Sequence, residues 1–297
     1  MHRDAQNLAV PCETAHDLEL FEAVLRYFLD PCEERRAALG GFDYEIGEIG
    51  EADGAESEGG ADKAEARKAA LVMQAANTVL DAEGREMFKF VAEQGSPVVC
   101  RAGCTGCCHQ PITCDPFEAA LIGLYLERRP ELRAAFEAAH AEWDERTRDV
   151  RDAFVAWAER RFRDGVDDGS HRFADFVVPC VFLRDGLCRV YPVRPYACRS
   201  YISVSPACPA PADPAEKPGM QGMGFGVYTS HMDARAAVRA MLWRRFGIDP
   251  SRVRTRLMPE LVRRFLAGGL AEALRCATAE TPPGKSSGAA SSDPPSP

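Results

Sequence analysis

Thiol side chains are the residues of this chain best suited to do chemistry, and they are clustered. Four cysteines fall within nine residues, at Cys100, Cys104, Cys107 and Cys108. Four more follow at Cys180, Cys188, Cys198 and Cys208. Thiolates this close repel one another unless they are protonated, oxidised or neutralised by a cation, and soft metal ions or iron–sulfur clusters accept them best. The spacing therefore predicts a metal centre rather than a disulfide framework.

The first cluster is compatible with tetrahedral zinc or with an iron–sulfur cluster such as 4Fe-4S. Both commonly use short cysteine spacings on glycine-containing loops, and Gly103 and Gly106 supply such a loop. Consecutive side chains in regular structure diverge, so Cys107 and Cys108 either serve different sites or divide into a ligand and a neighbouring residue. Eight thiols allow two four-thiolate sites, or one cluster plus spare thiols.

The second group of cysteines overlaps a predicted β-hairpin at residues 179–191. Asp185 and Gly186 tolerate the positive φ angles of a tight turn and are flanked by residues that favour strands. With this turn, Cys188 lies opposite Leu183, whereas Cys180 points to the other face of the hairpin. The two sulfurs share a metal only if Cys180 lies outside the ladder or a bulge intervenes. We expect one of these arrangements.

Three sequence segments then occur in a recognisable order: CRAGCTGCCHQ, DPFEAALI and PCVFLRDGLCRVYPVRPYACRSY. In combination they resemble the YkgJ-type cysteine cluster family, described as a zinc- or iron-chelating CxxCxxCC domain. The match covers residues 99–208, although the first spacing has three intervening residues rather than two and a long helical segment separates the two cysteine groups. The resemblance implies that the ligands come from Cys100, Cys104, Cys107, Cys108, Cys180, Cys188 and Cys198, with Cys208 as a further member.

Residues beside the cysteines are candidates for supporting roles. The arginines at 194 and 199 would neutralise an anionic site, and the tyrosines at 191 and 196 would hydrogen-bond to it or shield it. Ordinary packing is the alternative for all four. His109 is a candidate ligand in place of a cysteine or a donor to sulfur. The remaining cysteines and histidines are interpreted as packing residues or lack supporting spacing: Cys12, Cys32, Cys114, Cys276, His140, His171 and His231.

Two enzymatic alternatives use S-adenosylmethionine. The spacing of Cys100, Cys104 and Cys107 equals the radical SAM pattern, but Gly106 occupies a place that is usually aromatic, and Cys108 follows at once. Flagellin lysine methylases, in the broader family, carry a related cysteine cluster, which makes a protein lysine methylase the other alternative. No glycine-rich nucleotide loop follows a strand in this sequence. The biological role of the metal stays open.

Composition sets the broad class. The chain has 297 residues, 46% of them hydrophobic, which is enough for a substantial core. A net charge of −9 argues against a nucleic-acid partner, because phosphate binding needs a basic face. No apolar run has the length of a signal peptide or a membrane span, so we expect a cytoplasmic protein without a membrane partner. Disulfides rarely persist in that compartment. A protein partner is left open.

The periodicity predicts a mainly α-helical fold with a cysteine-rich metal-binding loop and a short β-hairpin. The expected organisation is an N-terminal helix in 1–40, an acidic glycine-rich linker at 41–62, a helical metal-binding domain at 63–276 around a cysteine core at 99–208, and a disordered tail at 277–297.

Proline and glycine mark the expected helix boundaries. The first helix spans residues 15–38, and Pro31 ends or kinks it. Further helices are expected at 63–93, 116–129, 131–163, 230–246, 250–266 and 270–277. Asp115 and Glu118 predict a capped helix start, whereas Gly84 and Pro259 predict interruptions. A seam for packing on a neighbouring helix is formed by Phe136, His140, Trp143, Thr147, Val150, Phe154 and Trp157.

Overall fold

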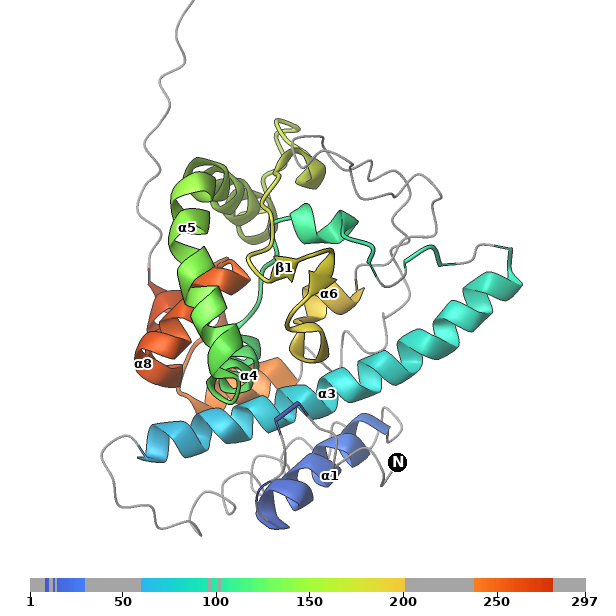
Figure 1. The fold of residues 1–297 in the computed structure, drawn as a ribbon, viewed down its shortest axis with the longest axis vertical. Coiled ribbons are helices and arrows are strands. Elements are labelled where there is room, and N and C mark those ends of the chain that lie inside the picture. Colours follow the sequence, from blue (N-terminus) through green and yellow to red (C-terminus); the bar gives the residue numbers. More distant parts are fainter. Residues whose placement is uncertain are drawn as a thin grey trace, which may run out of the picture.

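The computed structural model describes residues 9–10, 13, 15–29, 60–95, 98–100, 103–200 and 238–279. These parts are mainly helical and include one two-stranded antiparallel hairpin (Figure 1), which confirms the predicted fold class. The α-helices whose bounds are defined are α1 (Ala15–Leu29), α3 (Gly60–Glu93), α4 (Pro116–Glu127), α5 (Pro130–Ala158), α6 (Tyr196–Ser200) and α8 (Met258–Thr278). In the described parts of the chain, no helix is both long and apolar enough to cross a membrane.

Helix α3 packs against α1, α4, α6 and α8. It has α1 on one side and α4 on the other (Figure 1). Its buried middle is rich in alanine, including Ala69, Ala70, Ala75 and Ala76. Alanine has the highest helix propensity, and its small side chain lets neighbouring helices approach from both sides. The predicted break at Gly84 is wrong because α3 continues through it. One glycine costs only about 1 kcal/mol, which a long packed helix tolerates.

Helix α4 lies at the centre of the fold and begins as its sequence predicts. The Asp115 carboxylate accepts hydrogen bonds from the backbone N–H groups of Phe117 and Glu118 at 3.0 and 2.9 Å. The Glu118 carboxylate accepts in return from the Asp115 N–H at 3.2 Å, completing a capping box. Most residues of α4 are buried because α3, α5 and α8 all pack against it. A helix covered on several sides must be apolar nearly all round.

Helix α5 carries the predicted packing seam. Pro130 stands in its first turn, where the missing proline N–H has no partner to lose. Every residue of the predicted seam is buried or half-buried. The helix ends in a π-helical turn, η3 (Glu159–Arg163). Its long apolar stripe faces the segment at 176–182, which leads into the hairpin.

The C-terminal helices differ from the prediction at one proline. Residues 238–245 are helical, whereas 230–237 lie outside the described residues. A 3-10 turn, η6 (Pro250–Arg252), precedes α8. The predicted interruption at Pro259 is wrong because this proline lies in the first turn of α8. Non-helical backbone at Gly268 and Gly269 kinks α8, and this kink falls between the two helices expected there.

Several predicted segments lie wholly or partly outside the described residues. They are the second half of the first predicted helix after Leu29, the acidic linker up to residue 59, the proline-rich stretch at 206–226 and the tail from residue 280. Helix α3 begins two residues before the predicted end of the linker, and α8 ends at Thr278, inside the predicted tail.

Candidate metal centre

Two backbone hydrogen bonds join the first cysteine loop to the segment that precedes the hairpin. The Cys180 N–H donates to the Cys108 carbonyl at 2.7 Å, and the Val178 N–H donates to the His109 carbonyl at 2.9 Å. These bonds connect parts of the chain about seventy residues apart. The two cysteine groups predicted to form one site are therefore neighbours in the fold.

The first loop places its paired cysteines on a short 3-10 helix, η2 (Gly106–His109). Its hydrogen bonds run from the Cys108 N–H to the Thr105 carbonyl at 2.8 Å and from the Gln110 N–H to the Cys107 carbonyl at 3.1 Å. Although consecutive side chains diverge on such a helix, the thiols of Cys107 and Cys108 are hydrogen-bonded to each other. The two thiols therefore lie close together in the fold.

The hairpin has the predicted turn and register. Strands β1 (Leu183–Arg184) and β2 (Leu187–Cys188) are joined by Asp185 and Gly186, whose φ angles are 52° and 71°. Cys188 is paired with Leu183, as expected. Cys180 lies before the ladder in a turn closed by the Leu183 N–H, which donates to the Cys180 carbonyl at 3.1 Å. This position outside the ladder is one of the two arrangements that allow Cys180 and Cys188 to face the same site.

The last cysteine of the group lies on α6, a helix of five residues. A 3-10 turn, η5 (Tyr191–Val193), connects it to the hairpin. The Glu118 carboxylate accepts a hydrogen bond from the Tyr196 N–H at 2.8 Å and so joins the start of α6 to the start of α4. Cys198 follows two residues later, and its N–H donates to the Pro195 carbonyl at 3.0 Å.

Five thiols influence one another and so define the candidate centre: Cys107, Cys108, Cys180, Cys188 and Cys198. A hydrogen bond with Cys108 lowers the pKa of Cys107 to about 7, and the charge of Arg194 acts in the same direction. The same bond and burial raise the pKa of Cys108. Burial raises the pKa of Cys180 to about 12, and it also raises the pKa values of Cys188 and Cys198.

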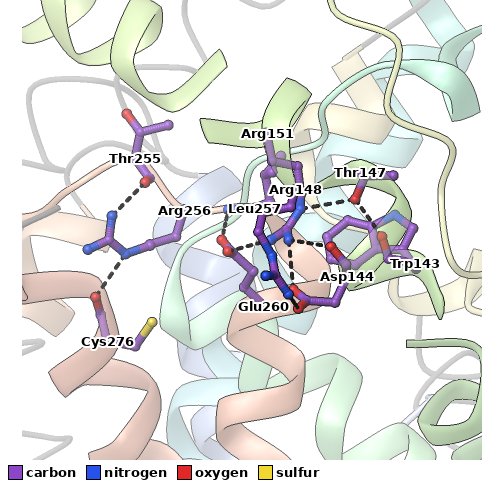
Figure 2. A network of polar contacts seen from close by, with 10 residues as sticks. All are labelled: Trp143, Asp144, Thr147, Arg148, Arg151, Thr255, Arg256, Leu257, Glu260 and Cys276. Carbon is purple, nitrogen blue, oxygen red and sulfur yellow. Dashed lines mark hydrogen bonds and ion pairs between the residues drawn. The ribbon is translucent and has the colours of Figure 1, made fainter. Parts of the chain in front are cut away.

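The other predicted ligands differ in their exposure and in whether the structure describes them. Cys100 is exposed, whereas Cys104 is half-buried like the five grouped thiols. Cys208 lies outside the described residues. Cys276 is half-buried on α8, where its carbonyl accepts a hydrogen bond from Arg256 at 3.0 Å (Figure 2). It therefore has a packing position, as predicted.

His109 is buried beside the paired cysteines, with 7% of its surface exposed. Its Nδ1 atom has no hydrogen-bond partner among the described residues. Burial lowers the pKa of the imidazole, which favours the neutral form that metals bind. The next residue, Gln110, is also buried with both amide atoms unpaired. Buried polar atoms without partners are rare, so His109 and Gln110 form an unusual polar site next to the paired cysteines.

The donor set fits a soft metal by its chemistry. Neutralising several buried thiolates requires a cation, and zinc or an iron–sulfur cluster supplies it in all-cysteine sites. Among the described residues, no three His, Cys, Asp or Glu side chains already stand in a metal-holding arrangement. Binding at the five thiols would therefore require side-chain rotations and loss of the thiol protons.

A polar network on α5 and α8 supports the segment before Cys180 (Figure 2). Arg151 is buried and donates to Thr147 at 3.0 Å, to Asp144 at 2.7 Å and to Glu260 at 2.8 Å. Its guanidinium carbon lies 4.6 Å from the centre of the Trp143 ring, close enough for a cation–π interaction. The network therefore fixes the orientation of this tryptophan.

Trp143 connects this polar network to the candidate metal centre. Its indole N–H donates to the Pro179 carbonyl at 2.7 Å, immediately before Cys180. The sequence predicts Trp143 only as a packing residue on the α5 seam. The role of Glu118 at α6 is likewise missed, since the capping box explains only one of its two carboxylate oxygens. A buried indole N–H needs a partner, which is the one signal that pointed beyond packing.

Comparison with known proteins finds no match for this chain among protein-family models, curated protein sequences or solved structures.

Proposed function

We propose that this protein binds a soft metal, as zinc or an iron–sulfur cluster, through half-buried cysteine thiolates. The observation that carries the proposal is the approach of the η2 loop to the hairpin, where Cys180 is hydrogen-bonded to the backbone of Cys108. Five thiols from these segments and α6 gather there. Four of them suffice for either kind of centre. The resemblance to the YkgJ-type family, proposed on sequence motifs, agrees with this function.

The grouping favours a centre that joins both cysteine segments over one confined to the first. A radical SAM cluster would need Cys100, Cys104 and Cys107 to bind together. Here Cys107 is grouped with Cys108 and the hairpin thiols instead, and Cys100 is exposed. The metal accordingly has a structural, sensing or metal-handling role in the proposal, with S-adenosylmethionine chemistry as the lesser alternative.

The proposal is tested by purifying the protein without oxygen and measuring bound iron, sulfide and zinc together with the visible absorption spectrum. We expect one centre per chain in the wild type. Cys188→Ser should lose it because a hydroxyl is a poor ligand for soft metals. Cys276→Ser is the matched control and should retain it.

The outcomes separate the two metals. Stoichiometric iron and sulfide with a visible chromophore supports a cluster, whereas a colourless protein with one zinc supports a zinc site. A reduced wild-type chain that takes up neither zinc nor a reconstituted cluster overturns the proposed function. Equal metal content in Cys188→Ser and Cys276→Ser would remove the hairpin from the site.

A further inference from the structure

Arg199, the residue after Cys198, joins α6 to the long helix α3. It is buried, with 7% of its surface exposed, and it forms an ion pair with Asp81 of α3. Its Nε atom donates to the Arg194 carbonyl at 2.8 Å, and another guanidinium nitrogen donates to the Pro192 carbonyl at 2.7 Å. One side chain therefore connects α3, the η5 turn and α6.

Helix α6 needs such contacts to keep its position. A helix of five residues is far too short to be stable by itself, so tertiary contacts must hold it. Glu118 accepts a hydrogen bond from the Tyr196 N–H at the start of α6, and Arg199 binds Asp81 and two carbonyls near its end. Cys198 lies between these two anchors. Its direction is therefore set by residues of α3 and α4.

The two arginines next to the thiols have different surroundings. Arg194 stacks on the exposed Tyr191 ring at 4.0 Å, and its Nε atom has no hydrogen-bond partner among the described residues. Arg199 instead uses its planar fork on a carboxylate and two carbonyls. A lysine supplies the same charge at one point but cannot satisfy three acceptors in this geometry. Arg194 therefore supplies a positive charge near the thiols, whereas Arg199 holds α6 to its neighbouring elements.

We propose that Arg199, held by Asp81, is a positioning residue that places the Cys198 sulfur against Cys180 and Cys188, so that α3 contributes to the affinity of the metal centre. The inference rests on the proposed metal binding and adds to it a regulatory connection: a change in the packing of α3 alters how many thiolates reach the metal. Arg199 touches no metal in this role and acts only through Cys198.

The test uses cobalt(II) as the probe, because thiolate-to-cobalt absorption reports the number of bound thiolates. We expect Arg199→Lys to lose about a quarter of this absorption, as one of four thiolates leaves. The cobalt affinity should fall by about tenfold or more, the size typical for residues that orient metal ligands. Cys198→Ser should show the same spectrum. The double variant should lose no further intensity, since both changes remove the same ligand.

Two further variants make the test specific. Asp81→Asn removes the partner of Arg199 from a half-exposed position, so it keeps the test valid if Arg199→Lys fails to fold, and it should lower the cobalt affinity in the same direction. Arg189→Lys is the matched control: this arginine is exposed on the hairpin and paired with Asp185 at 2.8 Å. It should bind cobalt as the wild type does.

The outcomes distinguish this inference from the proposed function. If Arg199→Lys and Asp81→Asn retain the full absorption and affinity while only lowering the melting temperature, Arg199 is a purely structural residue and the inference fails. An additive loss in the double variant also overturns it, because Arg199 would then act on another ligand. If the wild type binds neither cobalt, zinc nor a reconstituted iron–sulfur cluster, the metal centre itself is wrong, and this inference fails with it.

Discussion

Two of the buried charged residues are arginines that each serve several hydrogen-bond acceptors. Arg151 and Arg199 are both almost fully buried, and each is hydrogen-bonded to side chains and backbone carbonyls of different elements. An isolated buried charge is costly, so removing one partner is more harmful than the modest energy of a single hydrogen bond suggests. The guanidinium group suits such positions because its five donors have fixed directions. At the residue scale, these two side chains are the main polar links between helices.

His140 makes stability depend on pH. Burial lowers its pKa from the ordinary value of 6.5, and Arg263 and Arg151 act in the same direction, whereas Asp144 and the Pro259 carbonyl oppose them. The unfolded chain then binds a proton more readily than the folded one, so the stabilisation present above pH 6.5 is lost as the pH falls toward the lowered pKa. His140→Gln should flatten this dependence. Urea unfolding at several pH values checks it, and an unchanged slope would contradict the assignment.

Residue types and spacing are enough to predict part of the centre. The spacing predicts all five cysteines of the candidate centre, because clustered thiols are readily recognised as candidate ligands of soft metals. It does not separate them from the exposed Cys100, since exposure is a property of the folded loop. Asp81 is not predictable at all. An aspartate on a helix surface has no pattern until the fold brings Arg199 to it.

At the scale of elements, the closest helix packing is between α4 and α8. Gly123 lies on α4 against the ring of Phe265 on α8, and no side chain fits between them. Small residues at such points let two helices approach closely, at the cost of a glycine inside a helix. The sequence gives no sign of this contact. From the sequence alone, a glycine inside a helix predicts only lower helix stability, because the neighbouring side chain that requires a small residue there is not known.

Gly123→Ala should therefore destabilise the protein, although alanine is the better helix former. A Cβ atom at this position would overlap the Phe265 ring, and overpacking of this kind typically costs about 1–3 kcal/mol. The measurement is the free energy of urea unfolding. Gly123→Ala combined with Phe265→Leu should recover part of the loss, because a smaller side chain makes room for the methyl group. Strictly additive effects would show that the two positions do not interact.

Elements that depend on interactions between residues close in the sequence can be predicted from the sequence. The α4 cap depends on Asp115 and Glu118, and the hairpin turn depends on Asp185 and Gly186; both interactions close within four residues. Predictions at Gly84 and Pro259 fail for a different reason. The cost of the glycine is small beside the packing of the α3 segment before it, and the effect of the proline depends on whether it lies first or in the middle of a helix.

For the whole molecule, the thiol centre lies where separate parts of the chain meet. The η2 loop, the hairpin and α6 contribute thiols, and they are held by Trp143 of α5, Glu118 of α4 and Asp81 of α3. The helical core of α3, α4 and α8 also packs against the thiol-bearing segments, since Val178, Phe182, Val190 and Val193 belong to the same hydrophobic cluster. We therefore predict that metal binding stabilises the thiol-bearing segments and leaves the helical scaffold largely unaffected, unlike in a small zinc finger whose fold depends on its metal.

This division predicts which parts of the molecule respond to metal. Binding to the native state alone stabilises it by about 2.7 kcal/mol when the free metal is 100 times its Kd. Hydrogen exchange should therefore slow most in residues 104–110 and 178–200, which carry the thiols, because their local opening breaks metal bonds. Helices α4 and α8 should show much smaller changes below the global unfolding limit. A chelator should reverse the protection, and Cys188→Ser should not acquire it. Uniform protection throughout the chain would instead mean that the metal is required for the whole fold.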